Sequence, residues 1–98
     1  MDRSKALIAL ARRLERAASA RDWRAVDRAD RELATLMSSL SVRGSPSAAE
    51  RAALERARRA HEQAREECAR ELARIGRALA EARDRRDGCL AYAMSSEG

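Results

Sequence analysis

Residues 20–23, Ala20-Arg21-Asp22-Trp23, separate two helical patterns and decide the fold. Asp22 is a good helix N-cap, because its carboxylate can accept hydrogen bonds from free backbone N–H groups at the positive end of a helix dipole. A connection this short forces the helices on either side of it into an antiparallel hairpin. We expect Asp22 and Trp23 to be structural anchors of that hairpin, with Trp23 as the apolar plug at its tip.

Apolar residues recur at intervals of three and four on both sides of this turn, which is the period of an amphipathic helix. Before the turn they are Leu7, Leu10, Ala11, Leu14, Ala17 and Ala18, and after it they are Val26, Ala29, Leu33, Leu36, Met37 and Leu40. The sequence therefore predicts helices over about residues 4–20 and 22–40.

The one clear loop of the chain is the segment 41–47, Ser-Val-Arg-Gly-Ser-Pro-Ser. Gly44 and Pro46 both interrupt a helix there. Ser47 and Glu50 that follow have the spacing of a capping box, in which each side chain accepts from the backbone N–H of the other residue. A new helix is therefore predicted to begin at this point.

This third helix is predicted to run over residues 47–87 and to end at Asp87-Gly88, before a short apolar segment at 89–94. The chain is expected to be one all-α domain over residues 1–98. Its architecture would be an antiparallel hairpin plus a long third helix. That is a three-helix bundle, or a four-helix bundle if 89–94 forms a short C-terminal helix of its own.

The third helix is longer than the hairpin that can cover it. At 1.5 Å per residue the first two helices are each roughly 27 Å long, and the third is about 60 Å long. Its inner side is predicted to be the row Leu54, Ala57, His61, Ala64, Cys68, Leu72, Ile75, Leu79 and Ala82. Packing against the hairpin should end near residue 66, which leaves Leu72, Ile75 and Leu79 uncovered. Three things could cover them: the segment 89–94, a second copy of the chain, or another protein.

The composition favours long helices and a small core. Of the 98 residues 23 are Ala, whereas Phe is absent and Trp and Tyr occur once each, so that the residues favoured in strands are scarce. Alanines contribute little burial, and a monomer of this size should be only marginally stable. The net charge of +5 raises nucleic acid as a partner. However, the sequence has no recognition-helix motif, zinc motif or aromatic stacking platform, so we regard this as the lesser alternative.

Catalytic and metal-binding patterns are missing from the sequence. The single histidine, His61, lies seven residues from Cys68 on the predicted inner side, which is too far for a shared metal within one helix. No phosphate-binding loop or nucleophile elbow occurs. We expect no catalytic residue, no cofactor and no metal, and interpret His61 and Cys68 as packing residues. No signal peptide precedes Cys68 and Cys89 and no apolar stretch could span a membrane, so a cytoplasmic protein with reduced thiols is expected.

Two short segments resemble the FliT family of flagellar type III export chaperones, which are short, cytosolic, helical proteins. The first is Ala20-Arg21-Asp22-Trp23-Arg24-Ala25-Val26 with the acidic-basic run 27–33 after it, where an Asp-Trp pair begins the second helix. The second is the basic segment 83–86 that leads to Leu90-Ala91-Tyr92. The likeness covers nearly the whole chain in architecture but only these two segments in residues.

The resemblance implies a function in protein export. Such chaperones hold the C-terminal segment of the filament-cap protein before export and dock at the export ATPase apparatus, and some bind the flagellar master regulator. It implies that Leu72, Ile75 and Leu79 bind the partner, with Met37 and Leu40 as further candidates, and that Leu90 and Tyr92 form an autoinhibitory cover. The alternatives are a structural coiled-coil oligomer, of which a homodimer is the simplest form, and the basic nucleic-acid-binding protein.

Overall fold

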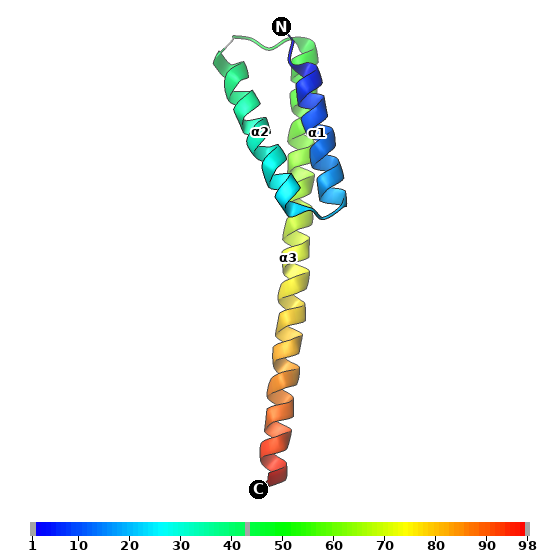
Figure 1. Ribbon diagram of the computed structural model, residues 1–98, viewed down its shortest axis with the longest axis vertical. Helices are drawn as coiled ribbons and strands as arrows, with labels where there is room; N and C mark the ends of the chain where they lie inside the picture. Colours follow the sequence, from blue (N-terminus) through cyan, green and yellow to red (C-terminus); the bar gives the residue numbers. More distant parts are fainter. Residues whose placement is uncertain (1, 43, 98) are drawn as a thin grey trace. The chain divides into compact units, whose positions relative to one another are not determined.

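The computed structural model describes residues 2–42 and 44–97 and holds three helices within them: α1 (Ser4–Ser19), α2 (Trp23–Val42) and α3 (Ala48–Glu97) (Figure 1). The predicted all-α fold is confirmed. The chain divides into two compact units, Met1–Cys68 and Ala69–Gly98. We call the first the three-helix unit, since it contains α1, α2 and the beginning of α3, and the second the C-terminal unit.

The turn between α1 and α2 closes both helix ends with local hydrogen bonds. The N–H of Asp22 donates to the carbonyl of Ala17 at 2.9 Å and that of Arg21 donates to Ala18 at 3.0 Å, the two bonds of a Schellman motif. Arg21 has a φ of 56°, the left-handed conformation that this motif requires. The N–H of Ala25 donates to Oδ1 of Asp22 at 3.1 Å, which confirms the predicted N-cap.

One core joins the three helices of the three-helix unit. It contains Leu7, Leu10, Ala11 and Leu14 from α1, Ala29, Leu33 and Leu40 from α2, and Ala53, Ala57 and Ala60 from α3. Leu7 and Leu14 are the largest side chains that are fully buried. Leucines thus come from α1 and α2, whereas the fully buried side chains of α3 in this core are alanines. Small side chains on α3 leave room for leucines from two helices at once.

The buried side of α3 is rotated from the predicted one. Ala57 and Ala64 are buried as expected, but Ala53 and Ala60 are buried beside them, while Leu54 and His61 are only half-buried. The reason is that α3 packs against two helices, so its buried side is centred between them. The predicted row was chosen for its largest apolar side chains, and it lies toward one edge of the surface that packs against α1 and α2.

The start of α3 is fixed by the predicted capping box. The N–H of Glu50 donates to the Ser47 hydroxyl at 3.1 Å, and the N–H of Ser47 donates to Oε1 of Glu50 at 2.9 Å. The other carboxylate oxygen of Glu50 accepts from the backbone N–H of Arg3 at 3.0 Å. Glu50 therefore links the beginning of α3 to the residues that precede α1.

These contacts predict a loss of stability in acid. Hydrogen bonds from the backbone N–H of Ser47 and then of Arg3 hold the pKa of Glu50 below its ordinary value of 4.5. In the unfolded chain this carboxyl binds its proton at higher pH, so its contribution to stability is present above pH 4.5 and is lost as the pH falls through the folded pKa. Replacing Glu50 with Gln should lower the melting temperature at pH 6 and reduce the further fall between pH 6 and pH 3. Thermal unfolding followed by circular dichroism measures both.

Glu66→Gln, at an exposed position of the same helix, is the matched control. It should melt like the unaltered chain at pH 6. An equal effect of both substitutions would show that the Glu50 contacts do not stabilise the fold.

Helix α3 does not end where the sequence predicted. It continues through Gly76 and through Asp87-Gly88 to Glu97, so the segment 89–94 is its last part and not a separate fourth helix. A glycine within a helix costs only about 1 kcal/mol relative to alanine, and no proline follows to stop the helix. The helix would have ended at Gly88 only if the residues after it had packed against another part of the protein.

Candidate functional site

Three of the large aliphatic side chains that are exposed in the C-terminal unit lie in one row. Leu72, Ile75 and Leu79 expose 64%, 41% and 61% of their surfaces. Their spacing of three and four residues places them on one side of α3. We call these three side chains the Leu72 face. Its exposure agrees with the sequence prediction that these three side chains are left uncovered.

The lengths of the helices explain why burial stops before this face. Helices α1 and α2 have 16 and 20 residues, and the last α3 residue buried with them is Ala64. Among residues 69–96, Glu71 is half-buried and all the others are exposed. A helix without tertiary contacts is marginally stable in water. A partner that covers residues 69–97 would therefore stabilise the helical conformation of this part of α3.

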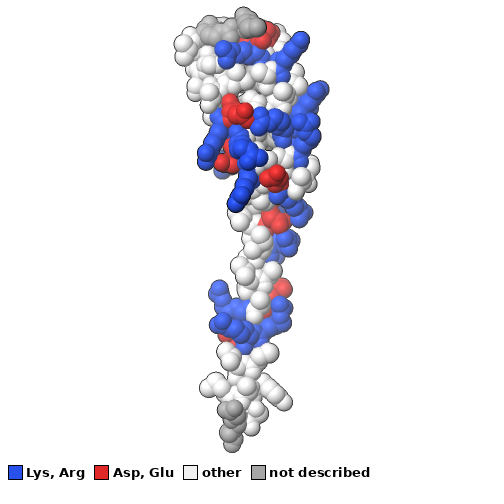
Figure 2. Space-filling view, in the orientation of Figure 1, with Lys and Arg blue, Asp and Glu red and all other residues white. Residues whose placement is uncertain are grey.

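Charged side chains surround the Leu72 face and continue along α3 to Asp87. Glu71 accepts two hydrogen bonds from Arg74, the shorter of them 2.6 Å, in an i,i+3 pair on the helix surface. Such pairs contribute only a few tenths of a kcal/mol. Figure 2 shows a band of basic side chains farther along α3 and an uncharged stretch beyond it, which corresponds to residues 88–96 in the sequence.

The proposed cover residues, Leu90 and Tyr92, lie exposed on the same uninterrupted helix. Two residues apart, they are separated by about 200° around the helix and so point to different sides. Leu90 is 15 residues from Ile75, about 22 Å along the axis. In this structure neither residue covers the Leu72 face.

A second apolar surface is a groove of about 460 Å³ between α2 and α3 in the three-helix unit. Met37, predicted to bind a partner, lines it together with Leu33, Ala34 and Leu54. Leu40, the other α2 candidate, retains only 8% of its surface and belongs to the core. It follows Met37 by three residues, a rotation of about 60° around the helix, which turns it inward. Leu40 is thus a core residue rather than part of a binding surface.

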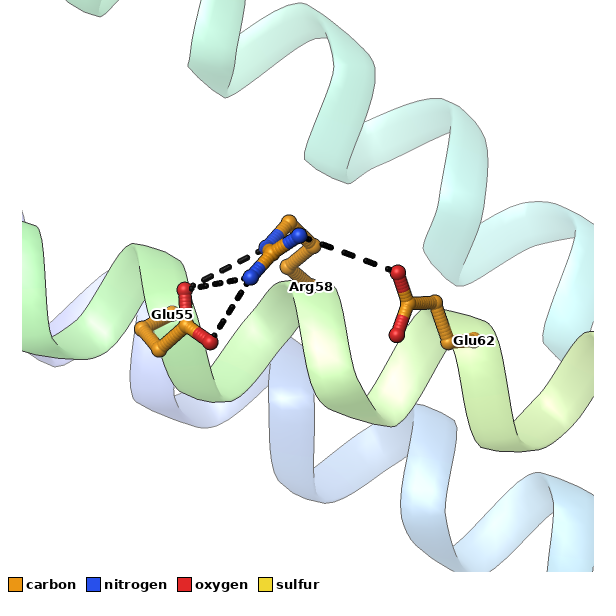
Figure 3. Close-up of polar contacts among 3 residues, drawn as sticks. All are labelled: Glu55, Arg58 and Glu62. Atoms are coloured by element: carbon orange, nitrogen blue, oxygen red, sulfur yellow. Dashed lines mark hydrogen bonds and ion pairs between the residues drawn. The ribbon is translucent and has the colours of Figure 1, made fainter.

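One edge of the groove is a row of ion pairs on α3. Arg58 projects from the side of α3 that faces α2 and lies between Glu55 and Glu62 (Figure 3). Its Nη2 lies 2.9 Å from Oε1 of Glu55, and its Nη1 lies 3.8 Å from Oε1 of Glu62. The hydrogen bond from Arg58 lowers the pKa of Glu55. These contacts hold the Arg58 guanidinium at the rim and leave the groove floor apolar.

His61 closes the groove at the Asp30 end. Its Nδ1–H donates to Oδ1 of Asp30 at 2.8 Å, which supports the interpretation of His61 as a hydrogen-bonded edge residue. Cys68 is half-buried and Cys89 exposed, and both are thiols. Over residues 2–42 and 44–97 no group of three or more His, Cys, Asp or Glu side chains could hold a metal ion. The apolar surfaces are therefore the features that carry a functional argument.

The predicted binding residues belong to two different units. Leu72, Ile75 and Leu79 belong to the C-terminal unit, whereas Met37 lines a groove of the three-helix unit. The groove was not predicted from the sequence, because Leu54 was assigned to the buried side of α3. Met37 exposes 48% of its surface because α2 and α3 leave space between them at this position. Met37 on α2 and Leu54 on α3 are large apolar side chains, whereas the buried core residues of α3 are alanines. This combination is the signal that could have indicated the groove.

Comparison of the chain with known protein families, with curated proteins and with solved structures gives no match. In the part of the chain that the structure describes, no helix has the length and apolar character needed to cross a membrane.

Proposed function

We propose that this protein acts by binding another protein through the Leu72 face of α3. The observation that carries the proposal is the row of three large aliphatic side chains exposed among charged residues in the middle of α3. Fully burying one leucine or isoleucine contributes about 1.5–3 kcal/mol, so covering this row would provide a large part of the affinity of an ordinary complex. Contiguous apolar surface of this kind marks interaction sites.

The geometry of the row favours a helical partner segment. Side chains at intervals of three and four on one helix interlock with the same spacing on another. A partner whose amphipathic helix lies along residues 72–79 would place apolar side chains between Leu72, Ile75 and Leu79. Its polar side would face the charged residues on either side of the row.

The FliT-like family gives this proposal its specific form. We propose a cytoplasmic export chaperone whose client is the C-terminal segment of a flagellar filament-cap protein, with the export ATPase apparatus and the flagellar master regulator as further partners. Support comes from the Asp22-Trp23 pair at the start of α2 and from the antiparallel hairpin that it begins. The proposal assigns the protein no catalytic step, cofactor or metal.

The client assignment is tested by co-purification with the filament-cap protein encoded in the same genome. The full chain is expected to retain the cap protein. A version ending at Asp87 should retain it equally well, because it keeps the Leu72 face and loses only residues beyond it. Weaker binding by the shorter version would place part of the binding surface in residues 88–98.

If the cap protein binds neither form, the export-chaperone assignment is wrong. Light scattering on the chain alone tests the alternative of a structural coiled coil. The alternative is supported if the chain forms a dimer or tetramer that persists on dilution and does not exchange with the cap protein. The Leu72 face would then join copies of this chain, and the chaperone proposal would be wrong.

A further inference from the structure

The hairpin formed by α1 and α2 has more positive charge than its own carboxylates neutralise. Residues 4–42 contain eight basic and five acidic side chains. All five acidic side chains have structural partners: Glu15 pairs with Arg56, Asp27 with Arg31, Asp30 with His61 and Glu32 with Arg13, and Asp22 caps α2. The surplus therefore remains on the basic side chains.

Four exposed arginines of the hairpin make no hydrogen bond or ion pair within the described residues. They are Arg12 and Arg16 on α1 and Arg24 and Arg28 on α2. Each pair has a spacing of four residues, so its two members lie on one side of their helix. We call these four side chains the arginine face.

The two helices bring part of this face together in space. Arg16 and Arg28 line the same open hollow between α1 and α2, about 320 Å³ in volume, with Arg13 beside them. Arg13 is already committed to Glu32, and its hydrogen bond is the main reason that the pKa of Glu32 is lowered. The positive charge of Arg28 lowers this pKa further without a hydrogen bond. Arg16 and Arg28 thus remain available at the hollow.

We propose that the arginine face binds an acidic segment of a partner protein, at a surface separate from the Leu72 face. A guanidinium binds a carboxylate through two parallel hydrogen bonds, and unpaired like charges near one another favour an anionic ligand. A flexible acidic peptide can place carboxylates at Arg16 and Arg28 and turn away from Asp22 and Asp27, whereas the phosphates of a DNA duplex have a fixed spacing and cannot avoid these two aspartates. Trp23, the only aromatic residue of the hairpin, is half-buried and offers no stacking platform.

The test measures binding of the full chain to a fluorescein-labelled peptide of about 15 glutamates by anisotropy at low salt. Replacing Arg12, Arg16, Arg24 and Arg28 with Gln should weaken binding at least about tenfold, the combined effect of four exposed ion pairs. The control variant replaces Arg77, Arg83, Arg85 and Arg86 with Gln, which changes the net charge equally in the C-terminal unit. It should lose less than about twofold. A third variant with Lys at the four hairpin positions should bind more tightly than the hairpin Gln variant and more weakly than the unaltered chain, because it keeps the charge but not the two parallel hydrogen bonds.

Equal losses in the two Gln variants would overturn the proposal, because net charge alone would then explain binding. Absence of binding by the unaltered chain at low salt would also overturn it. A DNA duplex of similar length that binds more tightly than the peptide, and loses affinity in the hairpin variant, would make this face a nucleic-acid surface instead. Because none of the four side chains makes a hydrogen bond or ion pair within the described residues, the hairpin variant should melt close to the temperature of the unaltered chain. The Lys variant keeps the positive charge of Arg28 near Glu32 and so checks for any loss of affinity that arises from unfolding.

Discussion

Replacing Leu72, Ile75 and Leu79 together with Asp is expected to weaken binding of the partner protein at least about 100-fold. The substitution removes three aliphatic side chains that would be buried in the complex and places three charges in an apolar interface. The unfolding of the three-helix unit should be unchanged, because these residues are exposed and contribute nothing to its core. Isothermal calorimetry with the cap-protein segment measures the affinity, and urea unfolding measures the stability.

A matched variant carries the same three charges on another side of the same helix. Ala69, Ala73 and Ala80 are exposed and lie on average about 107° around the helix from the middle of the Leu72 face. Replacing them with Asp should change the affinity by less than about threefold, the size of an ordinary surface substitution. A similar loss in both variants would mean that added negative charge or weakened helix formation, and not the Leu72 face, controls binding.

Replacing Leu14 with Ala is expected to have the largest effect on stability. Leu14 is fully buried in a core that otherwise contains many alanines, so its removal leaves a cavity that small neighbours cannot fill. The expected cost is about 3 kcal/mol, which corresponds to a fall of roughly 12–24 °C in melting temperature for a unit of this size. Urea unfolding with circular dichroism gives the free energy directly.

Leu72→Ala is the matched control for this substitution, since it removes the same atoms from an exposed position. Its effect on the free energy of unfolding should be within about 0.5 kcal/mol. Equal destabilisation by the two substitutions would show that Leu72 is buried in solution, and would contradict the division of the chain into a packed unit and an uncovered one.

The parts of the fold that local chemistry determines could be predicted from the sequence. The hairpin follows from the short connection at Asp22, whose carboxylate caps α2 as expected. The start of α3 follows from Ser47 and Glu50, whose reciprocal bonds are both present. These features depend on residues within a few positions of each other, so no knowledge of distant packing was needed.

The end of α3 and the orientation of its buried side could not be predicted in the same way. Gly88 lowers helix stability by only about 1 kcal/mol, which is too little to decide between ending and continuing a helix. The choice of Ala53 and Ala60 over Leu54 and His61 depends on two other helices packing against α3 at once. Apolar periodicity along one helix does not contain that information.

Only part of the candidate binding surface could be predicted, because some of it depends on how the helices pack. Comparing helix lengths was enough to predict that Leu72, Ile75 and Leu79 are exposed. Met37 and Leu40 were indistinguishable, because both are apolar and lie on nearly the same side of α2. Only the packing of α2 against the core assigns Leu40 to the interior and Met37 to the groove.

The most direct measurement of the central claim is site-specific photo-crosslinking to the bound partner. A photoreactive amino acid would be placed singly at Leu72, Ile75 or Leu79, and at Ala73 or Ala80 as controls on another side of the same helix. Binding through the Leu72 face predicts strong crosslinks from the first three positions and weak ones from the controls. Equal crosslinking from all five positions, or crosslinks from the controls alone, would contradict it.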